Sequence, residues 1–108
     1  MASDPGQPFT LAFVGHAGPE TADRAAAYED AVLALLGDHG ARVLYRGRRA
    51  RSADASLPFE VHLLWFPNQV AFDAYMADER RAVLLAEFGD VFTSKQAVVM
   101  DTIAGSLP

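Results

Sequence analysis

The sequence predicts a single α+β domain with the element order βαββαβ. Two kinds of periodicity carry this prediction. Four segments place apolar residues at alternate positions, which is typical of strands, and the segments between them repeat apolar residues at three and four positions, which is typical of helices. Glycine, proline and helix-capping residues separate these segments. A chain of 108 residues without cysteine fits one domain with an apolar core and no disulfide framework.

The beginning of the chain predicts a strand followed by a helix. The strand is expected at Phe9–His16, where large apolar residues take every second position. The helix is expected from Pro19, which suits a first helical position because no N–H is needed there. An apolar stripe runs along this helix from Ala25 to Leu36. Gly37 and Gly40 are expected to end it.

The middle of the chain predicts two strands joined by a loop. Residues Ala41–Gly47 and Phe59–Phe66 both alternate between two faces. The polar stretch Arg48–Pro58 has no periodicity and is expected to be the loop. Pro67 cannot donate to a strand ladder and ends the third strand.

The last part predicts a divided helix and a fourth strand. Asn68 is a good helix N-cap, and the residues after it form an apolar stripe. Asp78 caps a second short helix, which is expected to reach Gly89. The fourth strand is expected at Gln96–Ile103.

This order is the ferredoxin-like plan: a four-stranded antiparallel sheet of order 4-1-3-2, with the helices on one face. The other face stays bare, and it is too apolar to be left in water. We expect a second copy of the chain to cover it, giving a homodimer through the open sheet face. The residues expected on that face are Ala12, Val14, Leu44, Leu64, Phe66, Val99 and Ile103.

Composition limits the domain and its partners. Residues 9–104 are expected to form the domain, with a flexible tail at 1–8 and another at 105–108. The net charge of −5 disfavours nucleic-acid binding, which depends on cations that neutralise phosphates. No apolar run is long enough to span a membrane, so we expect a cytoplasmic protein without a membrane partner.

One passage resembles a known superfamily. Residues Phe66–Arg80 read FPNQVAFDAYMADER, which is similar to the pattern F-[PS]-[SN]-x-x-A-F-x-A-Y-x-x-D-x-R of the dimeric α/β-barrel superfamily. The small DUF1330-type and antibiotic-biosynthesis-monooxygenase-like proteins look closest. The resemblance implies the ferredoxin-like fold and the dimer, but no single activity, because this scaffold hosts many chemistries. Quinol oxygenases of this superfamily carry Asn where this chain has Val61.

Catalytic candidates gather where the first strand ends beside the third. Antiparallel pairing of these strands is expected to bring His16 close to Glu60 and His62, with Arg46 and Arg48 emerging at the same end. A histidine moves protons at neutral pH, and a carboxylate beside it orients the imidazole. The arginines are expected to bind an anionic substrate oxygen.

Aromatic residues are the other candidates for substrate binding. In members of this superfamily the ligand pocket opens between the sheet and the helices. Tyrosine and tryptophan need polar partners when buried, which favours a pocket there. The aromatic candidates are Tyr28, Tyr45, Trp65 and Tyr75.

These residues leave three functions open. The first is a cofactor-independent enzyme, without metal, that binds a small organic molecule: an isomerase, cyclase or oxygenase acting on an aromatic, polyketide-like or enolisable substrate by histidine acid–base chemistry. The second is a non-catalytic dimeric ligand-binding or interaction protein. The third is a haem- or metal-binding protein, with Glu60, His62 and His16 as ligands of a two-His, one-carboxylate site.

Overall fold

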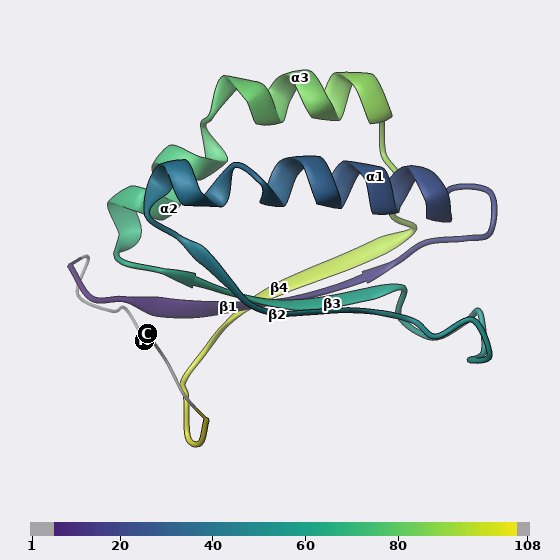
Figure 1. Cartoon of the computed structure of the whole chain (residues 1–108), viewed down its shortest axis with the longest axis horizontal. Coiled ribbons are helices and arrows are strands. Elements are labelled where there is room, and N and C mark those ends of the chain that lie inside the picture. The colour runs from purple at the N-terminus through teal and green to yellow at the C-terminus, as the bar shows by residue number, and fades with distance from the viewer. Residues whose placement is uncertain (1–5, 106–108) are drawn as a thin grey trace.

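The computed structural model describes residues 6–105, and the predicted tails fall largely outside this range. Four strands form one sheet, and the helices all lie on one side of it (Figure 1). The predicted α+β class and element order are therefore confirmed. The elements are β1 (Phe9–His16), α1 (Ala22–Leu33), the 3₁₀ helix η1 (Leu36–His39), β2 (Arg42–Arg48), β3 (Glu60–Phe66), α2 (Gln69–Met76), α3 (Glu79–Phe88) and β4 (Ser94–Met100).

The sheet has the predicted strand order. Its order is β2-β3-β1-β4, the order 4-1-3-2 counted from the other edge, and every neighbouring pair is antiparallel. The end of β1 lies beside the start of β3, with Gly15 opposite Glu60. The sheet thus brings two distant parts of the chain together at the predicted place.

Several boundaries differ from the prediction. Helix α1 already ends at Leu33 and the 3₁₀ helix η1 follows it, so Gly40 ends the helical segment as expected while Gly37 lies inside η1. Two further differences have a clear cause. Helix α1 starts at Ala22 and not at Pro19, because residues 18–21 form a turn in which the Thr21 N–H bonds the Gly18 carbonyl at 3.1 Å. Strand β4 starts at Ser94, where its pairing with His16 of β1 begins, and it ends before Ile103. In both cases hydrogen bonding sets the boundary, and hydropathy does not report it.

The predicted helix caps are confirmed. The Ala71 N–H donates to the side chain of Asn68 at 2.8 Å at the start of α2. The Arg80 N–H donates to the side chain of Asp78 at 2.9 Å at the start of α3. These bonds satisfy N–H groups that a helix start leaves without partners.

The faces of β3 are the reverse of the prediction. Glu60, His62, Leu64 and Phe66 are buried beneath the helices, and the alternate residues of β3 face the open side. Hydropathy could not decide this, because both faces of the strand contain apolar residues. The pairing with β1 decides it, since it aligns the large apolar residues of β1 with this set under the helices.

Strand β2 contains a bulge between Val43 and Tyr45. The extra residue puts these two side chains on opposite faces, although simple alternation predicted one face for both. Tyr45 consequently lies on the open face, 56% exposed, with its ring over Gly47. The bulge also turns Arg46 toward the buried face of β3, opposite His62.

The open face of the sheet is apolar, as predicted, but its residues are partly different. Leu64 and Phe66 are buried under the helices, and Val99 lies opposite Leu11 on the helix side. Ala12 and Val14 stay on the open face. The register gives the open face Thr10, Ala12, Val14, His16, Arg42, Tyr45, Gly47, Val61, Leu63, Trp65, Ser94, Gln96, Val98 and Met100.

The core between sheet and helices consists of two clusters. One centres on Phe66 and Tyr75, and the other on Ala25 and Phe92. Helix α3 contributes no buried residue to either and packs mainly on α1 (Figure 1). Within residues 6–105 no helix is long and apolar enough to cross a membrane.

Candidate functional site

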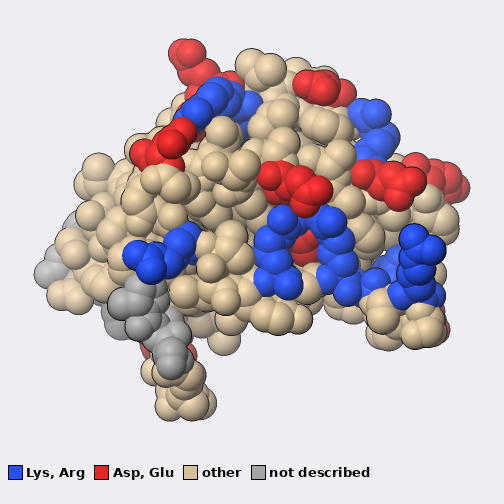
Figure 2. Space-filling view, in the orientation of Figure 1, with Lys and Arg blue, Asp and Glu red and all other residues tan. Residues whose placement is uncertain are grey.

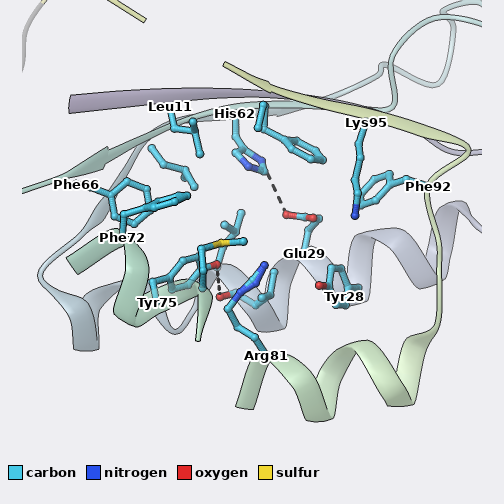
Figure 3. Close-up of a pocket in the computed structure, with 16 residues that line it drawn as sticks. Leu11, Tyr28, Glu29, His62, Phe66, Phe72, Tyr75, Arg81, Phe92 and Lys95 are labelled. Carbon is cyan, nitrogen blue, oxygen red and sulfur yellow. Dashed lines mark hydrogen bonds and ion pairs between the residues drawn. The ribbon is translucent and has the colours of Figure 1, made fainter. Parts of the chain in front are cut away.

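A cavity of about 340 Å³ lies between the sheet and the helices (Figure 3). This volume is within the range of small-molecule sites. Most of its wall is apolar, and four acidic or basic side chains interrupt it. The residues that line it are Leu11, Phe13, Tyr28, Glu29, Val32, Leu33, His62, Leu64, Phe66, Phe72, Tyr75, Met76, Arg81, Phe92, Lys95 and Ala97.

Glu60 is a buried carboxylate held by two arginines. It is only 1% exposed. Arg46 donates to both of its oxygens at 3.0 and 3.1 Å, and Arg48 donates to Oε1 at 2.9 Å. Burial acts to raise the pKa of Glu60, but hydrogen bonds from His62 and the two arginines outweigh it and bring the pKa to about 2. Glu60 is therefore ionised at neutral pH.

The two arginines are neutralised on their outer side as well. Asp30 of α1 lies 3.2 Å from Nη1 of Arg46 and 2.7 Å from Nη2 of Arg48. Figure 2 shows basic and acidic side chains in direct contact on this face of the molecule. Arg46 and Arg48 thus meet Glu60 as predicted, but neither lines the cavity. The structure places them as supports of a carboxylate.

His62 connects this charged group to the cavity. Its Nδ1 lies 2.9 Å from Oε2 of Glu60, and the ring of Phe13 stacks on the imidazole with centroids 4.5 Å apart. Because the ionised Glu60 can only accept, Nδ1 carries the hydrogen of this bond. When the imidazole is neutral, its lone pair is therefore on Nε2, which bonds to no described residue. His62 has the orientation of a general base held by a carboxylate.

Glu29 of α1 is a second ionisable group beside His62, and it was missing from the predicted site. It is 5% exposed, and its Oε2 lies 3.9 Å from Nδ1 of His62. Burial raises the pKa of Glu29 to about 7, and the neighbouring carboxylate of Glu60 adds to the rise. The sequence does hold a signal: Glu29 is the one charged residue within the apolar stripe, four residues after Ala25 and three before Val32.

His16 does not join this group, so its predicted place is wrong. It lies near Glu60 along the sheet, as expected, but it alternates onto the opposite face. There its Nδ1 is 3.2 Å from Oγ of Ser94 on β4. The strand pairing was predicted correctly, and the error is one of side-chain face.

The aromatic candidates divide between the two faces. Tyr28 and Tyr75 line the cavity, as predicted. The hydroxyl of Tyr75 donates to the carbonyl of Val32 at 2.9 Å, which satisfies it within the core. Tyr45 and Trp65 lie on the open face, because of the β2 bulge and the reversed faces of β3. Their predicted position between sheet and helices is therefore wrong.

Two cations at the cavity were also missing from the predicted site. Arg81 at the start of α3 lies over the Tyr75 ring, with its Cζ 4.8 Å from the centroid. Lys95 of β4, the only lysine of the chain, extends from the sheet toward the helices (Figure 3). Both are separated in sequence from the other site residues, so no local motif connects them.

The carboxylates and imidazole also resemble a metal-ligand set. Ligand atoms of Glu29, Glu60 and His62 lie within 4.8 Å of one another. Both oxygens of Glu60, however, already accept hydrogen bonds from Arg46, Arg48 or His62. A cation there would face two guanidinium groups, so these residues do not fit a metal. The set predicted with His16 does not form, because His16 lies on the other face.

Comparison with known proteins identifies the class of fold. No family model and no curated protein matches the chain. A protein of unknown function from Rhodopseudomonas palustris matches with a TM-score of 0.72 at 14% identity, over 95% of this chain and 88% of its own. A Bacteroides thetaiotaomicron protein, provisionally named an antibiotic biosynthesis monooxygenase, matches with a TM-score of 0.73 at 11% identity, over 97% and 98%.

A third match leads to the same fold. A NIPSNAP family protein of unknown function from Agrobacterium tumefaciens has a TM-score of 0.66 at 13% identity, over 93% of this chain and 92% of its own. At such identities the likeness shows the ferredoxin-like α+β fold. It confirms the predicted resemblance to the antibiotic-biosynthesis-monooxygenase-like proteins at the level of fold.

Proposed function

We propose that the chain is an enzyme that moves a proton on a small aromatic or enolisable molecule bound in the cavity. One observation carries this proposal. His62, oriented by an ionised carboxylate, lies beside Glu29, a buried carboxyl with a pKa of about 7. Groups shifted toward neutral pH in a pocket are typical of acid–base sites. The fold places both side chains on the wall of the cavity.

The reaction follows from these two groups. Nε2 of His62 takes a proton from a carbon next to a carbonyl, and the electrons of that C–H bond form the C=C bond of an enol. The carbonyl π electrons move to oxygen, which receives the proton of Glu29. The imidazolium of His62 then releases its Nε2 proton to water and the Glu29 carboxylate takes one proton from water, so both groups return to their starting state. No oxidant or reductant enters this step.

The apolar wall defines the kind of substrate. Phe66 and Phe72 stand at one end of the cavity and Phe92 at the other (Figure 3). Such walls favour flat aromatic rings, which stack on them or meet them edge to face. An isomerase or cyclase of aromatic or polyketide-like ketones fits this wall and the acid–base pair.

The open sheet face supports a second part of the proposal, a homodimer. Tyr45, Val98 and Met100 are each about half exposed there. A face on which apolar residues are this exposed is typical of an interface, and a second copy offers the same surface for twofold pairing. The dimer covers the face opposite the cavity.

The experiment uses two enolisable aromatic ketones, benzoylacetone and phenylpyruvate, whose tautomerisation is followed by absorbance. We expect the protein to accelerate at least one of them. The H62Q and E29Q variants are expected to lose about 100-fold or more of this acceleration. The R51Q variant, which changes an exposed loop arginine, is the control. Binding of either ketone without acceleration would instead support the non-catalytic ligand-binding function.

A further inference from the structure

We propose that Arg81 and Lys95 form an anion subsite in the cavity, so that its ligand is an aromatic acid with one carboxylate. This inference rests on the proposed function in one respect, namely that the same cavity binds the ligand. It adds the chemical class of the ligand and the two residues that select it. Neither residue takes part in the proton transfer.

Arg81 is a partly buried cation whose Nε has no polar partner among the described residues. Its Nε is buried and bonds to no group among residues 6–105. The guanidinium makes no ion pair with any described residue, and its nearest recorded partner is the ring face of Tyr75. A guanidinium left unpaired in this way favours a ligand that accepts its hydrogen bonds, and a carboxylate matches its planar donors.

Lys95 adds a second positive charge from the other wall. Its register opposite Gly15 directs it to the helix side of the sheet, where it lines the cavity. Within residues 6–105 its ammonium group has neither a hydrogen bond nor an ion pair. Lys95 is exposed as a whole residue, and Arg81 is partly buried. Together they bring two positive charges to a cavity whose lining contains one acidic residue, Glu29.

Most other cations of the chain differ from Arg81 and Lys95, because their side chains have hydrogen-bond partners. The side chains of five other arginines bond to carboxylates or backbone carbonyls. Arg42 lies over the ring of Trp65 on the open face, and Arg51 is exposed in a loop. The net charge is −5, so acidic groups are plentiful elsewhere. Two cations that face a cavity without partners thus indicate an anionic ligand.

The arrangement also positions the ligand. Figure 3 shows Arg81 on the helix side of the cavity and His62 on the sheet side. A carboxylate bound by Arg81 leaves the rest of the molecule between the apolar walls, toward the imidazole. The added negative charge also offsets the two cations.

The test measures binding of naphthoate and its neutral analogue naphthamide by calorimetry. We expect naphthoate to bind at least about tenfold more tightly, because only it carries the charge that Arg81 and Lys95 recognise. The R81Q and K95M variants are each expected to lose about tenfold in naphthoate affinity and to bind naphthamide unchanged. The R81K variant should recover part of the loss, and R51Q should match the wild type.

Each other outcome overturns the inference. Equal binding of the two probes, no binding of either, or an R81Q variant with full naphthoate affinity would each do so. The test of the proposed function can fail independently of this one. One of its two ketones, benzoylacetone, is neutral and does not need the anion subsite. If naphthoate binds through Arg81 and no ketone tautomerises faster, the anion subsite stands and the acid–base function does not.

Discussion

Glu60 and His62, two residues apart on β3, form a single hydrogen-bonded unit in which Nδ1 of the imidazole donates to Oε2 of the carboxylate at 2.9 Å. The strand alternation that separates them by two positions puts both on the buried face. Arg46 and Arg48 satisfy the remaining acceptor sites of Glu60. The imidazole is hydrogen-bonded at Nδ1, and Nε2 remains available to a ligand in the cavity.

This support predicts a large loss of stability when Glu60 is neutralised. In the E60Q variant the two arginines lose a buried counter-charge, and we expect the free energy of unfolding to fall by about 3–5 kcal/mol. Urea denaturation measures this. The matched control is D30N, which removes the 60% exposed partner of the same arginines and should cost less than about 1 kcal/mol. Equal losses in the two variants would contradict the role given to Glu60.

Glu29 predicts a dependence of stability on pH. Its pKa is about 7 in the folded chain, against 4.5 as the ordinary value, so between these values the folded state holds a proton that the unfolded state has released. The contribution of Glu29 to stability is thus fully present below about pH 4.5 and is lost as the pH rises through 7. E29Q should remove this fall and exceed the wild type by about 1–3 kcal/mol at pH 8. If the free energy of unfolding depended on pH in the same way in the wild type and E29Q, this role of Glu29 would be refuted.

Glu60 predicts the opposite dependence in acid. Its folded pKa of about 2 lies below its ordinary value of 4.5, so the stabilisation it gives is present above pH 4.5 and is lost as the pH falls toward 2. Urea denaturation of the wild type and E60Q across this range measures the difference. The difference in the free energy of unfolding between the wild type and E60Q should become smaller as the pH falls. A difference that stays constant would disagree with the lowered pKa of Glu60.

The open sheet face predicts a dimer that a charge disrupts. Val61 lies on this face, paired with Val14 of β1 and Gly47 of β2, and is 37% exposed. Light scattering should give a dimer for the wild type and a monomer for V61E, because the substitution buries an unpaired carboxylate in the interface. The control is V83E on α3, where the valine is 64% exposed, and it should stay dimeric. A monomeric wild type would end the dimer proposal.

Much of the fold could be predicted from the sequence because its signals are local. Pro67, Asn68 and Asp78 mark where β3 ends and where α2 and α3 begin, and each works through its own backbone neighbourhood. The strand order followed from the order of elements. These signals need no knowledge of how distant residues pack.

The candidate site was only half predictable, for reasons of packing. Glu60 and His62 are polar, so hydropathy gave no sign that they face the helices; the arginine pair and the stacked Phe13 make their burial possible. The β2 bulge, which puts the Tyr45 side chain on the open face, depends on pairing with β3. Arg81 and Lys95 reach the cavity only through the tertiary fold.

The central claim is that His62 lies in the cavity beside a carboxyl, Glu29, that keeps its proton up to about pH 7. The most direct measurement is a carbon-13 NMR titration of the side-chain carboxyls. We predict one glutamate signal with a midpoint near pH 7, absent in E29Q, because burial raises the pKa of Glu29 to about 7. If every carboxyl of the wild type titrates below about pH 5, the usual range for exposed groups, the claim is contradicted.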